Sequence, residues 1–202
     1  IFAPIFAWLW VRLGNAGKEP GSPLKMAIGL FLLSIGYLVI AFGVKGVEPG
    51  VKVSMFWLTT LYLLHTFGEL CLSPIGLSMV AKLAPLRFAS LLMGTWFLAN
   101  SASNKFAGTL SSLYPPGQGE FKAAADKGID LPSILNGSVT ATADQLKVLA
   151  EAGIPHHFPM FMGMQISSLY DFFMIFVIMS AAASVLLFII YKWLVKMMHG
   201  VQ

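Results

Sequence analysis

Four long apolar runs restrict what this chain can fold into. A helix needs about 20 mostly apolar residues to cross a bilayer, and each run is that long. The runs are Met26–Val44, Val53–Val80, Phe88–Leu113 and Ser167–Leu194. We therefore expect an all-α membrane protein with several crossings.

The composition supports a membrane protein and argues against a nucleic-acid partner. Hydrophobic residues make up 57% of the chain and charged residues 11%, whereas soluble domains carry about 25% charged residues. Lys and Arg gather at the ends of the apolar runs, without a basic patch alternating with aromatics. The single cysteine, Cys71, lies inside a run, so we expect no disulfide framework or CxxC metal pair within this chain. We also expect no metal and no cofactor, with the proton as the coupling ion.

The distribution of the runs divides the chain into three parts. A fifth apolar run, Ile1–Val11, is too short to cross the membrane, and we expect it to be the end of a span in a larger polytopic protein. Residues 1–113 then hold the first spans, 114–165 form a loop, and 166–202 hold the last span and the C-terminus.

Basic residues near the span ends predict the orientation. On one side of the membrane, the second loop carries only Lys45 and Lys52, and the long 114–165 segment is not counted because long loops cross regardless of charge. The other side would carry seven basic residues: Arg12, Lys18, Lys25, Lys82, Arg87, Lys192 and Lys196. The positive-inside rule then places the first and third loops and the C-terminus in the cytoplasm and 114–165 outside it. A chance imbalance is the alternative.

The 114–165 segment has its own local signals. It is rich in Pro and Gly at both ends, and Thr142 with Gln145 forms a capping-box pattern. Gly153 is placed to end the helix that follows. We expect about one short helix, on the membrane surface or partly disordered. His156 and His157 are expected to be solvated loop residues rather than metal ligands.

Glu69 is the carboxylate inside the second apolar run. His65 and Ser73 flank it at four-residue spacing, which places the three side chains on one helical face. A charge at this depth costs several kcal/mol unless it faces water or a partner, so Glu69 marks a functional site. A protonated or hydrogen-bonded packing residue is the alternative.

Pro74 and Leu77, which follow Glu69 in the same helix, suggest a gate. Pro74 cannot donate its N–H, so the carbonyl of Leu70 loses its helical partner. A bending helix that lines a cavity and a static kink both fit this pattern. Leu77 lies two turns from Glu69, where it would close a cavity or simply pack.

A tight loop at 82–87 makes the next helix an antiparallel neighbour of the first. That helix carries Trp96, Asn100 and Asn104 on one face. A Trp at mid-depth favours a cavity wall over an interfacial anchor. Lys105 is a second charge at membrane depth, and it either snorkels outward or pairs with a helix outside this chain.

These residues also carry a family resemblance. The stretches FGELCLSPIGLS at 67–78, KLAP at 82–85, MGTWFL at 93–98 and NKFAG at 104–108 resemble the second signature of the proton-dependent oligopeptide transporters. These are bacterial PepT-like members (POT/PTR) of the major facilitator superfamily. The resemblance implies that the chain is most of the C-terminal half of that fold, from the end of helix 8 through helix 12.

The resemblance also implies a function and residue roles. Family members import di- and tripeptides across the bacterial inner membrane, driven by protons, through alternating access. Glu69 would hold the peptide amino terminus and take part in proton coupling. Ser73 and Trp96, with Asn100 on the face of Trp96, would bind substrate, and Leu77 with Pro74 would form the gate. Partners would be protons, lipid and the N-terminal half.

Other readings stay open. The family's acidic and basic motif in its first helix lies outside this chain, and the 114–165 segment is larger than the fold needs. An intramembrane enzyme would need a nucleophile–base pair or metal ligands, for which the sequence has no HExxH, GxSxG or paired carboxylates. A channel subunit commonly forms rings of charge. A related carrier of another small solute such as nitrate remains the main rival.

Overall fold

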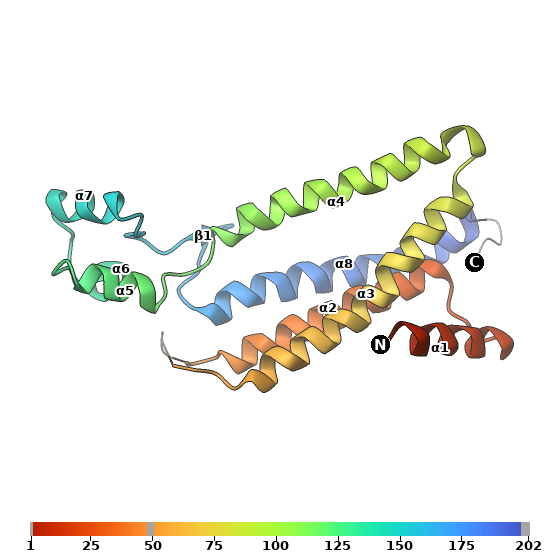
Figure 1. Ribbon diagram of the computed structural model, residues 1–202, viewed down its shortest axis with the longest axis horizontal. Helices are drawn as coiled ribbons and strands as arrows, with labels where there is room; N and C mark the ends of the chain where they lie inside the picture. Colours follow the sequence, from red (N-terminus) through yellow and green to blue (C-terminus); the bar gives the residue numbers. More distant parts are fainter. Residues whose placement is uncertain (1, 48–50, 199–202) are drawn as a thin grey trace.

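The computed structural model describes residues 2–47 and 51–198. It is built on long helices that run roughly along one axis (Figure 1). The long helices are α2 (Ser22–Gly43), α3 (Met55–Leu83), α4 (Ala89–Ser111) and α8 (Leu169–Met197). A shorter helix, α1 (Ala3–Asn15), precedes them, and a 3-10 turn, η1 (Leu86–Phe88), joins α3 to α4.

Close contact between glycines brings α2 and α3 together. A Cβ placed on Gly29 would lie 2.8 Å from the carbonyl oxygen of Gly68, and one on Gly68 would lie 2.8 Å from the carbonyl oxygen of Gly29. Farther along α2, a Cβ on Gly43 would lie 2.6 Å from the ring of Trp57. Small residues that admit such close approach are a common basis of helix packing in membranes, so α2 and α3 form a tight antiparallel pair.

Two serine hydroxyls join α2 to α8. Ser34 Oγ donates to the carbonyl oxygen of Val177 at 3.1 Å, and Ser184 Oγ donates to that of Ala27 at 2.9 Å. Both serines are buried, and hydrogen bonds between helices satisfy such groups in an apolar setting. The helix α2 therefore lies at the centre, between α3 and α8.

The helices differ in how well they suit lipid. Within the described residues, α2, α3 and α8 are long and apolar enough to cross a membrane. The run expected at 88–113 does form a helix, α4, but α4 is not among the three. Its polar side chains, including Asn100, Asn104 and Lys105, explain the difference. All four expected spans therefore form long helices, but α4 is less apolar than the expectation of four full spans requires.

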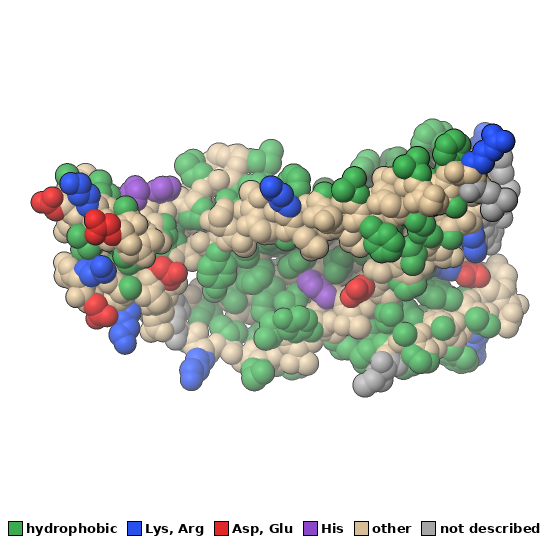
Figure 2. All heavy atoms as spheres, turned by 45° about the horizontal axis from the view of Figure 1, so that its top comes forward, with side chains coloured by type: hydrophobic (Ala, Val, Ile, Leu, Met, Phe, Trp, Pro, Cys, Tyr) green, Lys and Arg blue, Asp and Glu red, His purple; other side chains and the backbone are tan. Residues whose placement is uncertain are grey.

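The surface of the long helices is largely apolar. Figure 2 shows charged side chains gathered at both ends of the molecule and few along the helices. Large apolar side chains are exposed on every long helix, among them Phe31, Phe56, Leu98 and Ile189. A soluble monomer rarely exposes this much apolar surface, which agrees with helices that face lipid or further helices.

The segment 114–165 is more ordered than expected. In place of about one short helix, it holds α5 (Gln118–Ala125), α6 (Leu131–Leu135) and α7 (Ala143–Glu151). Two short antiparallel strands follow, β1 (Met160–Phe161) and β2 (Met164–Gln165). Figure 1 shows α5, α6 and α7 extending beyond one end of the long helices.

A small hydrophobic core explains this order. It contains Ala124, Ile129, Leu131, Leu135, Leu149 and Ile154. The expected capping box is confirmed: Gln145 Oε1 accepts from the Thr142 N–H at 3.0 Å, and Thr142 Oγ1 accepts from the Gln145 N–H at 3.4 Å. Gly153 follows α7 with a φ of 67°, a conformation that favours glycine. The expectation of one helix was wrong because α5 and α6 depend on these distant apolar contacts.

Candidate functional site

The helix α3 presents the central residues of the expected site. It continues through Pro74 without interruption, from Met55 to Leu83. Glu69 and Ser73 are exposed side chains on this helix. No ion pair or hydrogen bond of the Glu69 side chain is seen among the residues described. The carboxylate is therefore open to a ligand, a proton or a group outside this chain.

His65 is placed differently from the other two residues of the expected polar face. The ring of His65 makes an edge contact with the ring of Tyr37 on α2, and the two ring centroids lie 4.5 Å apart. A Cβ on Gly36 would lie 2.5 Å from the Cδ2 atom of His65. His65 thus packs against α2, whereas Glu69 and Ser73, which share its face of α3 by their four-residue spacing, are exposed.

The indole of Trp96 brings α4 onto α3. A Cβ placed on Gly76 would lie 2.3 Å from the Cη2 atom of Trp96, so only a glycine leaves room for the ring there. Gly76 directly precedes Leu77, whose side chain is 39% exposed. The structure therefore brings the expected pocket residue Trp96 to the part of α3 that holds the expected gate.

The remaining expected residues lie on exposed faces. Asn100 lies one turn from Trp96 and is exposed, as is Pro74 on α3. Lys105 is also exposed, and its side chain forms no ion pair within the described chain.

Sequence reasoning missed two residues that shape the site. Gly76 admits the Trp96 indole, and Tyr37 holds the His65 ring while stacking on Phe176 at 5.2 Å between ring centroids. Gly76 lies inside the motif at 67–78, but its partner is 20 residues away. Nothing local in the sequence indicates either contact.

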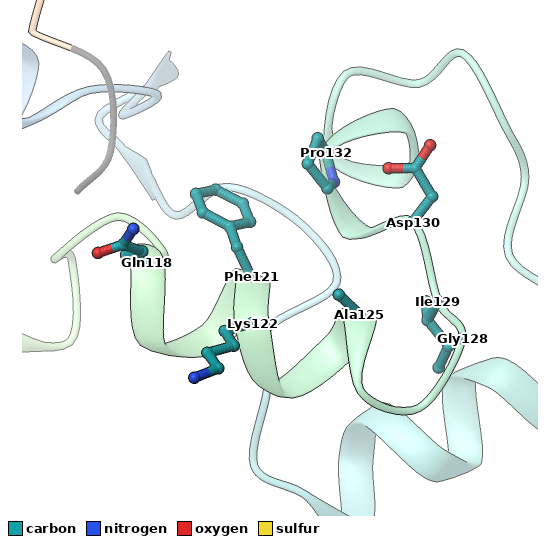
Figure 3. A pocket seen from close by; sticks show the side chains of 8 residues that line it. All are labelled: Gln118, Phe121, Lys122, Ala125, Gly128, Ile129, Asp130 and Pro132. Carbon is teal, nitrogen blue, oxygen red and sulfur yellow. The ribbon is translucent and has the colours of Figure 1, made fainter. Parts of the chain in front are cut away.

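A separate hollow lies on the 114–165 segment (Figure 3). It is lined by Gln118, Phe121, Lys122, Ala125, Gly128, Ile129, Asp130 and Pro132. Lys122 and Asp130 extend to different sides of the hollow in Figure 3, and the Asp130 carboxylate accepts a hydrogen bond from Ser133. Lys122 and Asp130 are therefore not placed to contact one ligand in this hollow at the same time.

No metal site accompanies these residues. Within residues 2–47 and 51–198, no three His, Cys, Asp or Glu side chains are grouped so that they could hold a metal ion. His156 and His157 contact each other at 4.8 Å between ring centroids, and this pair lacks a third ligand.

Comparison with known proteins identifies the family to which these helices belong. The profile PTR2, described as POT family, matches residues 1–125, a range that includes Glu69, Ser73, Leu77, Trp96 and Asn100. The uncharacterized transporter YclF of Bacillus subtilis is 43% identical over 115 residues, which is 56% of this chain and 23% of that protein. The peptide transporter YePEPT of Yersinia enterocolitica is 40% identical over 112 residues, 54% of this chain and 22% of that protein.

Solved structures agree in fold. A crystal structure of a mutant of the peptide transporter POT in complex with alafosfalin matches with a TM-score of 0.65 and 26% identity. The match covers 98% of this chain and 30% of that one. It confirms the expected helical, major-facilitator-type fold. The chain spans less than a quarter of the length of the two curated relatives. Since the family profile matches more than half of its residues, this chain belongs to the POT family.

Proposed function

We propose that this chain is part of a proton-coupled symporter that imports di- and tripeptides across the bacterial inner membrane by alternating access. The observation that carries the proposal is the exposed Glu69 carboxylate in the middle of the apolar helix α3, within the region that matches the POT family. Relatives named as peptide transporters support peptides as the cargo.

Glu69 supplies the chemistry for coupling in this proposal. As a carboxylate it attracts the ammonium group at the amino terminus of a peptide, and when protonated it loses that charge attraction. Proton binding and peptide binding at one group therefore influence each other. Through such linkage the arrival of the peptide amine changes the affinity of Glu69 for its proton, and protonation changes its affinity for the amine.

The surrounding side chains suit a peptide as cargo. Ser73 offers an exposed hydroxyl one turn from Glu69, and Asn100 offers an exposed amide on α4. Trp96 supplies an aromatic wall where it packs on Gly76. Ligand sites commonly combine apolar walls with a few polar groups that orient the ligand, and these residues supply both.

Pro74 and Leu77 are proposed as the gate. Pro74 deprives the Leu70 carbonyl of its helical donor, which lowers the cost of bending α3 at this point. Leu77 lies one turn farther along, toward the predicted cytoplasmic end. A bend at Pro74 would move Leu77 toward or away from the neighbouring helix and so close or open the path.

Uptake into liposomes tests the proposed function. The complete protein is reconstituted, and accumulation of a labelled dipeptide is measured with and without an inward proton gradient. Gradient-stimulated accumulation that unlabelled di- and tripeptides compete away is the expected result. Absence of accumulation by folded protein would reject peptides as the cargo, and nitrate and other small solutes would then be tested in the same vesicles.

A further inference from the structure

A second titratable side chain, His65, lies one helical turn from Glu69. Residues four apart on a helix have neighbouring side chains. The orientation predicted from basic residues places the start of α3 on the non-cytoplasmic side. His65 therefore lies between Glu69 and the side from which protons enter during uptake.

The imidazole of His65 is held in place by α2. Its ring meets the edge of Tyr37 at 4.5 Å between centroids, and Tyr37 in turn stacks on Phe176 of α8 at 5.2 Å. Gly36 leaves the space that the ring occupies, since a Cβ there would lie 2.5 Å from Cδ2 and 2.8 Å from Nε2 of His65. Contacts among α2, α3 and α8 thus fix the position of the imidazole.

Packing alone does not account for an imidazole at this position. The Nε2 atom is shielded from solvent and has no partner in hydrogen-bond geometry among the described residues, and the ring interacts otherwise with the backbone of Leu33 on α2. A phenyl ring would fill the same space without burying a polar nitrogen, which is costly when unpaired. Imidazole is also the side chain that ordinarily changes charge between pH 5 and 8.

The surroundings leave Glu69 as the acidic group nearest to His65 along its own helix. From α2 the ring faces the titratable Tyr37 and the uncharged Gly36. Behind Tyr37, α8 contributes Phe176, which has no charge. The backbone of Leu33 on α2 interacts with the ring as well, but it does not take up a proton, so Glu69 is the neighbouring group along α3 that a proton on His65 can neutralise.

On the basis of the proposed function, we infer that His65 is a positioning residue that exchanges protons with Glu69 from the non-cytoplasmic side. The imidazolium gives its N-bound proton to a carboxylate oxygen of Glu69, directly or through water. This leaves a neutral imidazole and a neutral carboxylic acid. The imidazole then regains a proton from water on the non-cytoplasmic side.

The variant His65→Gln tests this role in the complete protein. Glutamine keeps a polar group but does not titrate in this range. We expect proton-driven dipeptide uptake to fall about tenfold or more and to lose its dependence on pH near neutrality. Counterflow, in which labelled and unlabelled peptide exchange without net proton movement, should stay within about twofold of the parent protein because the peptide still meets Glu69.

A second variant moves the ring without removing it. The Gly36→Ala substitution places a methyl group where the His65 ring lies, so the same selective loss of driven uptake is expected. Gly108→Ala on α4 is the matched control, because a Cβ there meets nothing within 4 Å. The Gly36 variant keeps the test decisive if the Gln variant fails to fold.

The outcomes separate this inference from the proposed function. An unchanged pH profile in folded His65→Gln protein would overturn the role of His65 while peptide transport by the parent stands. Equal loss of driven uptake and counterflow would show a packing role and would also overturn it. Absence of peptide transport by the parent protein would reject the proposed function and, with it, the inference.

Discussion

At the scale of single residues, the site combines one exposed carboxylate with two aromatic rings that each pack against a glycine of another helix. Glu69 is exposed on α3, Trp96 packs on Gly76, and His65 packs on Gly36. Glycine is needed at both contact points because a larger side chain would occupy the space of the ring. The glycines thus set the positions of the rings relative to Glu69.

Replacing Glu69 by glutamine tests the coupling residue. Glu69→Gln keeps the size of the side chain but removes the group that exchanges protons. We expect proton-driven uptake to be abolished while the protein stays folded, as judged by size-exclusion chromatography. Glu151→Gln, at an exposed position of α7, is the matched control and should transport normally. Normal driven uptake in the Glu69 variant would refute this role for Glu69.

At the scale of elements, α2 organises the bundle. It meets α3 through the close approach of Gly29 to Gly68. It meets α8 through the hydroxyls of Ser34 and Ser184. Apolar burial between helices drives association only weakly in lipid, so close packing and such hydrogen bonds carry more of the stability.

A pair of alanine substitutions tests the glycine contact between α2 and α3. Gly29→Ala should destabilise the protein by about 1–3 kcal/mol, since its Cβ would overlap atoms of α3. Gly94→Ala on α4 should be neutral or slightly stabilising, because its Cβ meets nothing within 4 Å and alanine favours helix. Thermal unfolding in detergent measures both. Equal melting temperatures would show that the close approach of α2 and α3 contributes nothing.

The cap of α7 is the second test at this scale. Thr142→Ala removes the oxygen that accepts from the Gln145 N–H, and loss of such a cap costs about 1 kcal/mol. Hydrogen exchange of the first-turn amides of α7 should become faster. Thr140→Ala, at an exposed position before the cap, should leave exchange unchanged. Equal exchange in the two variants would argue against the cap.

At the scale of the whole molecule, membrane-type helices are joined to a small folded segment. The long helices expose apolar side chains over most of their length, whereas the segment 114–165 encloses its own core. The chain also spans 30% or less of the solved relatives. Further helices of the complete protein and lipid are therefore expected to cover the exposed surfaces.

Cysteine labelling tests the orientation that the basic residues predict. In right-side-out vesicles, an impermeant maleimide should label Ser138→Cys in the 114–165 segment and not Arg87→Cys in the loop before α4. Both positions are exposed in the structure. The native Cys71 is buried, so the parent protein serves as the unlabelled control. The reverse labelling pattern would invert the predicted topology.

The long helices, the family and the cap at Thr142 could all be predicted from the order of residues alone. Hydropathy, motif spacing and capping depend on residues that are close along the chain, so they can be recognised without the fold. The placement of Glu69 in the middle of a long apolar helix follows from the same local information.

The contacts between side chains of different helices became known only from the folded structure. It turned His65 toward α2, placed Trp96 on Gly76 and gave 114–165 a core that joins Ala124 to Ile154. These features depend on the approach of elements far apart in the sequence, and no local period of hydrophobic residues specifies which surfaces will touch.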